Sequence, residues 1–434
     1  MTAPTLAPAP ILAPILAPAP TLGEATRVFL RIGLLSFGGP AAQIGLMHRE
    51  LVDKHAWLNE KQFLSALSFC MLLPGPEAMQ LATYAGWRLH GTRGGLIAGL
   101  LFVVPGACVV LALSMIYAAY GSVPLVQALF LGVKATVVVI VIEALLRVAK
   151  RALKTRLHWV IAGLAFLGIF VFQVPFPVII LVAGLFGLAT SQGIATVAPP
   201  IANPRTVQTL ALWLALWLVP LGLLWWVEAG LLAQIGLFFS KLAVVTFGGA
   251  YAVLAYMAQT VVQDFGWLRA DQMIDGLGLA ETTPGPLILV TVFVGYLAAW
   301  QQDGVWLGLA GALVTLWMTF VPCFLWIFVG APYLEWITSR PRLNGALAAI
   351  TAAVVGVILN LSLWFALHVF FSEVSSWQIG PVQLLSVELA SWQPIASGLA
   401  VLAAVLILGR HWSLPTVLAL SAGLSAGLVW LGLA

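Results

Sequence analysis

Charged residues are scarce in this chain of 434 residues. Asp, Glu, Lys and Arg together make up 8% of it, against roughly a quarter of an average soluble domain. Hydrophobic residues make up 62%. A soluble fold of this length could not bury so much apolar surface, so the composition indicates a protein whose main solvent is lipid.

Cysteine and histidine are also few and widely spread. The three cysteines, Cys70, Cys108 and Cys323, lie far apart in apolar runs, and the six histidines form no cluster. This spacing excludes a disulfide framework and fits no metal site. Zinc motifs, phosphate-binding loops, dinucleotide fingerprints and clustered nucleophiles are missing from the sequence. We therefore expect no enzyme, no cofactor, no metal and no nucleic-acid partner.

The apolar runs lack the alternation of membrane-spanning strands, which favours helices over a barrel. We predict an all-α, multi-pass integral membrane protein with about 13 transmembrane helices, its partner being the lipid bilayer. The predicted spans lie at roughly 27–47, 62–85, 95–118, 122–146, 157–173, 175–192, 207–227, 234–257, 273–298, 305–330, 345–370, 392–409 and 412–433.

A basic cluster between Arg147 and Arg156 follows the fourth predicted span. Basic residues beside a span usually stay in the cytoplasm, so we interpret the cluster as a cytoplasmic anchor. Counting back four spans places the N-terminus in the cytoplasm. Residues 1–23 carry no charge and repeat Ala and Pro, which is typical of a flexible tail.

The chain contains an internal repeat. Residues 31–76 match residues 241–286 at a constant offset of 210, with 13 identities in 46 positions. We predict two homologous halves, 24–206 and 234–434, joined by a linking helix at 207–233, after the tail at 1–23. The first spans of the two halves are an odd number of spans apart, which predicts an inverted-topology repeat like those of secondary transporters.

The identities are densest at two motifs that interrupt apolar runs. Ser-Phe-Gly-Gly aligns with Thr-Phe-Gly-Gly, and Pro-Gly-Pro occurs in both halves. Proline and glycine break helices, and a helix restarting there presents free amides and a positive dipole end to an anion. The alternative is a helix kink or close helix packing. The substrate-binding candidates are Ser36, Gly38, Gly39, Pro74, Gly75, Pro76, Thr246, Gly248, Gly249, Pro284, Gly285 and Pro286.

Several charged residues fall inside the predicted spans, where charge is costly and often functional. Arg31 aligns with Lys241, and we expect each to hold an anion together with the free amides of its own half. Lys134 is a further cationic candidate in the fourth span. Glu77 and Glu281 lie at or near the breaks and are coupling candidates, with the roles of counter-ion or interfacial residue left open.

The stretch from Phe29 to Pro40, followed by Pro74-Gly75-Pro76, resembles the N-terminal half of the chromate ion transporter (CHR) family. Thr246 to Gly249, with Pro284 to Pro286, resembles the C-terminal half. The resemblance covers nearly the whole chain after residue 23 and implies the long-chain, two-domain form. Pro40 is replaced by Ala250 in the second copy, so the halves need not contribute equally.

This resemblance implies a secondary transporter of the bacterial inner membrane that exports chromate and gives chromate resistance. The alternatives are a transporter of sulfate or another small anion, because sulfate has the same charge and nearly the same shape as chromate, and an anion channel. The expected partner is a small inorganic oxyanion, and a homodimer is left open.

Overall fold

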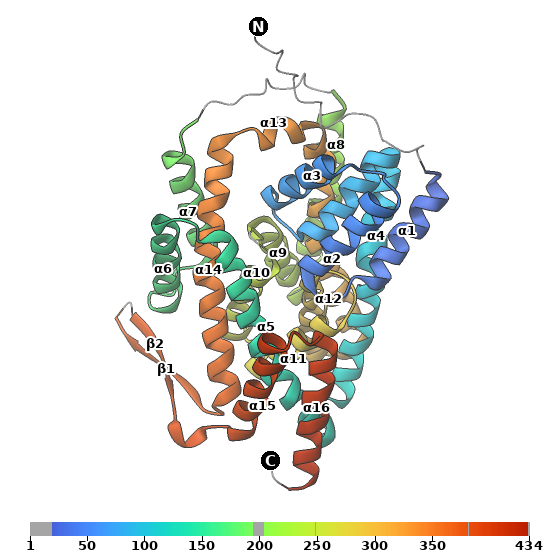
Figure 1. Ribbon diagram of the computed structural model, residues 1–434. Helices are drawn as coiled ribbons and strands as arrows, with labels where there is room; N and C mark the ends of the chain where they lie inside the picture. Colours follow the sequence, from blue (N-terminus) through green and yellow to red (C-terminus); the bar gives the residue numbers. More distant parts are fainter. Residues whose placement is uncertain (1–19, 194–203, 248, 381, 433–434) are drawn as a thin grey trace.

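The computed structural model describes residues 20–193, 204–247, 249–380 and 382–432. These residues are almost entirely helical (Figure 1). The helices of the first half are α1 (Leu22–Leu35), α2 (Gly39–His48), α3 (Glu60–Leu72), α4 (Glu77–Tyr120), α5 (Pro124–Ala152), α6 (Arg156–Phe170) and α7 (Phe176–Thr190). A connecting helix, α8 (Pro204–Trp226), follows.

The second half contains α9 (Leu231–Val245), α10 (Ala250–Gln259), α11 (Ala270–Thr282), α12 (Val290–Gly330), α13 (Leu334–Thr338), α14 (Pro341–Phe370), α15 (Pro394–Ala404) and α16 (Leu414–Trp430). One antiparallel hairpin, β1 (Val374–Ile379) and β2 (Val382–Val387), lies between α14 and α15, with Val374 opposite Val387.

The repeated segments form matching elements. Helices α3 and α11 begin and end 210 positions apart, and α2 and α10 both continue into short π-helical turns, at Arg49–Lys54 and Thr260–Asp264. Two long helices also reverse direction at corresponding points, α4 at His90–Gly91 and α12 at Asp303–Gly304. The same local signals therefore produce the same local structure in both halves.

Each predicted break of the first half is a turn at which the chain folds back on itself. Between α1 and α2 the chain turns at Gly38, whose φ is +82°, and Arg31 before the turn lies 3.7 Å from Glu50 beyond α2. Between α3 and α4 it turns at Gly75, and the rings of Phe69 and Tyr84 on either side are 6.4 Å apart. Both helix pairs are thus short hairpins.

The second half folds back in the same way. The rings of Phe238 and Phe265, on either side of the turn between α9 and α10, are 5.5 Å apart. Across the second Pro-Gly-Pro, a Cβ on Gly276 would lie 2.4 Å from the ring of Phe293, which shows how closely α11 and the first arm of α12 pack.

Four predicted spans, at 27–47, 62–85, 234–257 and 273–298, are therefore each divided into two helices. Helices α3 and α11 have 13 residues and α9 has 15. At 1.5 Å per residue they extend about 20 Å, less than the roughly 30 Å of a bilayer core. The described residues form five helical segments long and apolar enough to cross a membrane, within α4, α5, α8, 287–338 and α14. The predicted count of 13 is not confirmed.

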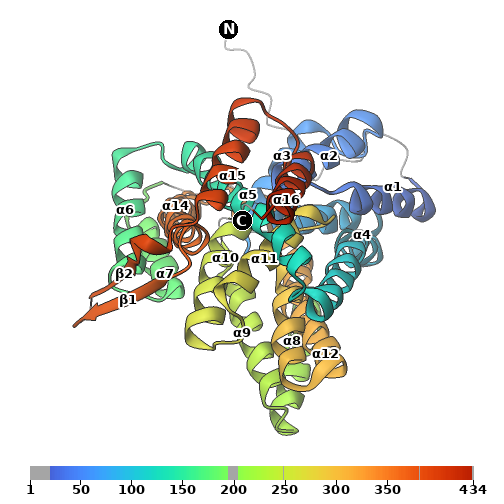
Figure 2. The ribbon, with the colours of Figure 1, turned by 90° about the horizontal axis from the view of Figure 1, so that it is seen from below.

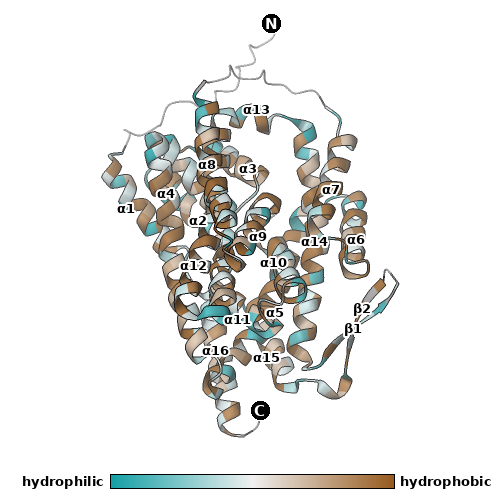
Figure 3. Cartoon of the chain, turned by 180° about the vertical axis from the view of Figure 1, so that it is seen from behind, coloured by the Kyte–Doolittle hydropathy of each residue, from teal (hydrophilic) through white to brown (hydrophobic). Residues whose placement is uncertain are grey.

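The helix arrangement has two distinct ends. The start of α1 and the short α13 lie at one end, and the β-hairpin and the end of α16 at the other (Figure 1). Seen along this direction, α5, α10 and α11 lie near the centre of the molecule (Figure 2). Hydrophobic residues dominate the lengths of the helices (Figure 3), as a lipid environment requires.

An inverted repeat makes a specific prediction about accessibility. Lys54 and Asp264 are repeat-equivalent, and both are exposed. In a chain whose Cys70, Cys108 and Cys323 are replaced by alanine, we expect a cysteine at Lys54 and one at Asp264 to react with an impermeant thiol reagent from opposite sides of the membrane. Labelling of intact cells and of inverted vesicles measures this. Reaction of both positions from the same side would contradict the inverted arrangement.

Candidate functional site

The four turns meet across the two halves of the chain. The amide of Gly75 donates a hydrogen bond to the carbonyl of Thr246 at 2.8 Å, and the amide of Gly285 donates to the carbonyl of Ser36 at 2.9 Å. Each Pro-Gly-Pro turn thus pairs with the Ser/Thr-Phe-Gly-Gly turn of the other half. We call these two contacts the crossings.

The crossings leave Ser36 and Thr246 buried. Their hydroxyls donate back to carbonyls of the preceding helical turn, those of Ile32 and Leu242, at 2.6 Å in both cases. The hydroxyl protons are therefore engaged within each half, and the backbone carbonyls make the contact between halves. Gly248 lies outside the described residues.

A glutamine strengthens only one of the two crossings. Gln43 is 1% exposed, and its Nε2 donates to the carbonyl of Gly285 at 2.7 Å and to that of Ser36 at 3.3 Å. The equivalent residue of the second half is Val253, which has no polar group on its side chain. The two crossings are therefore chemically different, although their backbone geometry matches.

A cavity of about 200 Å³ lies beside the crossing of Gly75 and Thr246, and we call it the central cavity. Its lining includes the first residues of three helices, Pro40 and Ala41 of α2, Glu77 of α4, and Ala250 and Tyr251 of α10. The first amides of a helix have no partner within the helix and carry the positive end of its dipole. Three such ends on one cavity favour an anion.

Two arginines reach the same cavity from α5. Arg147 and Arg151 lie one turn apart and both line it. Arg147 also pairs with Glu143 one turn before it. Both belong to the basic cluster that the sequence analysis interpreted as a membrane anchor. A basic cluster beside an apolar run has the same composition in either role, so the sequence alone did not separate them.

Two carboxylates lie near these cations. Glu77 lines the central cavity. Glu281 is buried, and one of its carboxylate oxygens accepts a hydrogen bond of 2.7 Å from the hydroxyl of Tyr251. Glu77 thus lines the cavity together with the two arginines, while Glu281 lies behind the lining residue Tyr251.

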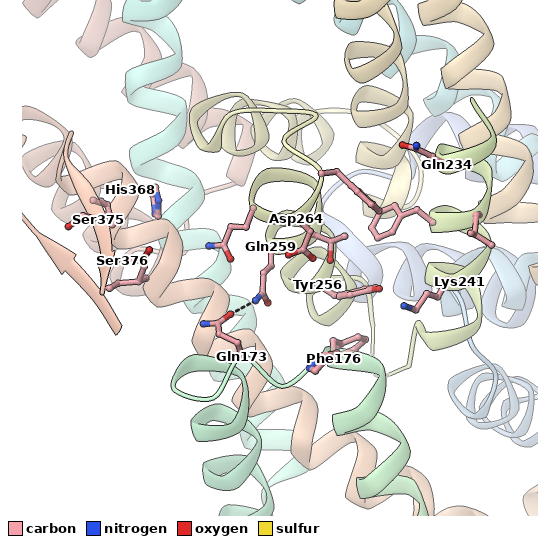
Figure 4. Close-up of a pocket in the computed structure, with 18 residues that line it drawn as sticks. Gln173, Phe176, Gln234, Lys241, Tyr256, Gln259, Asp264, His368, Ser375 and Ser376 are labelled. Atoms are coloured by element: carbon pink, nitrogen blue, oxygen red, sulfur yellow. Dashed lines mark hydrogen bonds between the residues drawn. The ribbon is translucent and has the colours of Figure 1, made fainter. Parts of the chain in front are cut away.

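The structure does not bring Arg31 and Lys241 together. Arg31 lies in a separate pocket with Glu50. Lys241 lies in a cavity of about 930 Å³, with its Nζ 5.9 Å from the ring centre of Tyr256 (Figure 4). The two pockets occupy equivalent places in the repeat, and neither cation is among the residues lining the central cavity. We expected each cation to lie with the breaks of its own half. In the structure each cation lies in an outer pocket, and the breaks contact those of the other half.

Lys134 lies elsewhere again, 3.4 Å from the carboxylate of Asp275. The sequence analysis did not single out Asp275. The sequence did contain a signal for it, because Asp275 falls inside the predicted span 273–298 and acidic residues are rare in membrane spans. Gln43 offered a weaker signal, as a polar residue in an apolar run.

The turn at Gly75 predicts a sharp effect of one methyl group. Its φ is +124°, and a Cβ there would lie 2.7 Å from Nε2 of Gln80 and 2.9 Å from Sγ of Cys323. We expect Gly75→Ala to lower the free energy of unfolding by about 1–3 kcal/mol, measured by denaturant titration in detergent micelles. Gly45→Ala is the control, because a Cβ at Gly45 meets nothing within 4 Å. Equal stability of the two variants would show that the turn tolerates a side chain.

Comparison with known proteins shows the family to which the chain is related. The family model described as "Chromate transporter" matches residues 23–188 and 233–428, one segment in each half. The chain is 36% identical over 341 residues to a chromate transport protein of Pseudomonas aeruginosa, covering 76% of this chain and 77% of that protein. It is 32% identical over 354 residues to a chromate transport protein of Cupriavidus metallidurans, covering 78% and 81%.

A probable chromate transport protein of Synechococcus elongatus is 32% identical over 372 residues, covering 83% of this chain and 91% of that protein. An uncharacterized transporter of Bacillus subtilis matches over 163 residues, which are 37% of this chain but 91% of that protein. No solved structure matches. With both halves matched by the family model, the chain belongs to the chromate transporter family.

Proposed function

We propose that this protein is a secondary transporter that exports chromate across the bacterial inner membrane and thereby gives chromate resistance. The observation that carries the proposal is the central cavity, where three helix starts and two arginines converge. A dianion leaving water needs nearby compensating charge, because an unpaired buried charge is prohibitive. The relatives named chromate transport proteins support chromate as the anion.

The proposed architecture is an inverted-topology repeat of residues 24–206 and 234–434, joined by a linking helix at 207–233. Matching short hairpins in the two halves, with turns that pair across the halves, support it. In such transporters the substrate site lies near the middle of the bilayer between the repeats. The basic cluster of α5 supports a cytoplasmic N-terminus by the positive-inside rule.

In this mechanism the free amides that follow Pro40, Pro76 and Gly249 bind the oxygens of chromate. Arg147 and Arg151 supply compensating charge from α5. The crossings form the barrier between the central cavity and the opposite side of the membrane. Arg31 and Lys241 act as outer cations in their repeat-equivalent pockets. Transport then requires the barrier to open on one side and close on the other.

Anion flux tests the transport activity. Radiolabelled chromate is presented to inverted membrane vesicles, with sulfate as the competing substrate. We expect uptake of chromate, and faster uptake when unlabelled chromate is already inside, because alternating access permits exchange. A channel gives uptake without this acceleration. Uptake of sulfate with chromate excluded would assign the protein to sulfate, and equal uptake by vesicles lacking the protein would contradict transport altogether.

The two arginines of the central cavity provide a prediction about affinity. Hydrogen bonds to charged groups contribute about 1.5–3 kcal/mol, so we expect Arg147→Gln and Arg151→Gln each to raise the KM for chromate by roughly tenfold or more. Arg156→Gln is the control, because Arg156 belongs to the same basic cluster, is exposed and is not among the residues lining the cavity. A KM unchanged in the first two variants would return the cluster to the role of an anchor.

A further inference from the structure

We propose that Asp275 is the residue that binds the coupling proton, in a site formed with Lys134 and Tyr117. The proposal rests on the proposed transport function and adds to it the ion that drives the cycle. It concerns a second site, separate from the central cavity.

One carboxylate oxygen of Asp275 is hydrogen-bonded and the other is available to bind a proton. Oδ2 accepts a hydrogen bond of 2.7 Å from the hydroxyl of Tyr117. Oδ1 lies 3.4 Å from Nζ of Lys134 and has no hydrogen bond among the described residues. The side chain of Asp275 is 5% exposed and that of Lys134 is 21% exposed. A single cation at this distance leaves the buried carboxylate incompletely compensated.

The pair lies at the wall of a pocket. Asp275, Lys134 and Tyr117 line a pocket of about 330 Å³, to which Ser122, Gln127 and Gln272 contribute further polar groups. Glu281, the other buried acid of α11, is not among the residues that line this pocket or the central cavity. Of the two acids, only Asp275 therefore has a described route for a proton from solution.

The charged surroundings of Asp275 are simple. Its own helix α11 contributes Asp271, which pairs with Arg269 at the rim of the pocket. Helix α5 contributes Lys134, and α4 contributes the hydroxyl of Tyr117. The residues of α12 that line the pocket, Leu297 and Trp300, are uncharged. Protonation of Asp275 therefore changes one specific contact, the ion pair with Lys134.

That ion pair ties the two halves together. Lys134 and Tyr117 belong to the first half and Asp275 to the second. Helix α11 leads directly into the second Pro-Gly-Pro turn, and Gly285 of that turn bonds to Ser36 at a crossing. A proton bound at Oδ1 neutralises the carboxylate and weakens the tie of α11 to α5. Because proton binding and the packing of α11 against α5 depend on the same ion pair, each changes the equilibrium of the other.

The transport test uses the full-length protein reconstituted in liposomes. For the wild type we expect a pH gradient to accelerate chromate uptake, and a trapped pH-sensitive dye to report proton movement with chromate. Asp275→Asn should lose this acceleration and the proton signal while keeping chromate exchange between equal concentrations on both sides. Asp271→Asn, a carboxylate of the same pocket and the same helix, should keep all three properties.

A second measurement needs no anion and no transport. The infrared spectrum of the purified protein between acidic and alkaline pH should contain a carboxylic acid C=O band that is absent in Asp275→Asn and present in Asp271→Asn and Glu281→Gln. The double variant Lys134→Met with Asp275→Leu, which removes both charges of the pair, should also lack the band and the response to a pH gradient.

The possible outcomes separate the two proposals. Wild-type liposomes that transport no chromate would overturn the proposed function, while the infrared band would still report on Asp275. Chromate transport without proton movement, an Asp275→Asn variant that still responds to a pH gradient, or a spectrum in which Asp275→Asn keeps the band would each overturn the proton site.

Discussion

Two backbone hydrogen bonds between the halves hold the centre of this structure together. Backbone amides and carbonyls that are buried away from water must find partners within the protein. At the turns, the amides of Gly75 and Gly285 bond to the carbonyls of Thr246 and Ser36 in the opposite half. The pairing of the breaks meets this requirement, and the central cavity with its three helix starts lies beside one of the two crossings.

The breaks themselves were predictable from the sequence, whereas their partners were not. Pro-Gly-Pro and Gly-Gly are local signals, because the conformational limits of proline and glycine act on the residues next to them. The fold-back of 62–85 into α3 and the first arm of α4 depends on contacts such as that of Phe69 with Tyr84. The pairing of one half with the other depends on tertiary structure alone. Aligning the two copies of the repeat pairs Gly75 with Gly285, but in the structure Gly75 contacts Thr246.

The same distinction explains which site residues the sequence analysis found. Glu77 and Glu281 were identified because they lie beside a recognisable motif. Arg147 and Arg151 were interpreted as an anchor, because positive charge next to an apolar run is expected at a membrane surface. Asp275 has no motif around it, and its importance depends on Lys134, which lies 141 positions earlier in the chain and 3.4 Å away in space.

The crossings also bear on how such a chain evolves. In a symmetric pair of identical subunits, any substitution appears twice and must suit both copies of the interface at once. Joining the copies in one polypeptide removes that condition, and each crossing is free to diverge. Gln43 faces Gly285 at one crossing while Val253 occupies the equivalent position of the other half, and Glu281 corresponds to Met71. Because the two crossings are separate positions in one chain, they can carry different polar groups while their backbone hydrogen bonds stay alike.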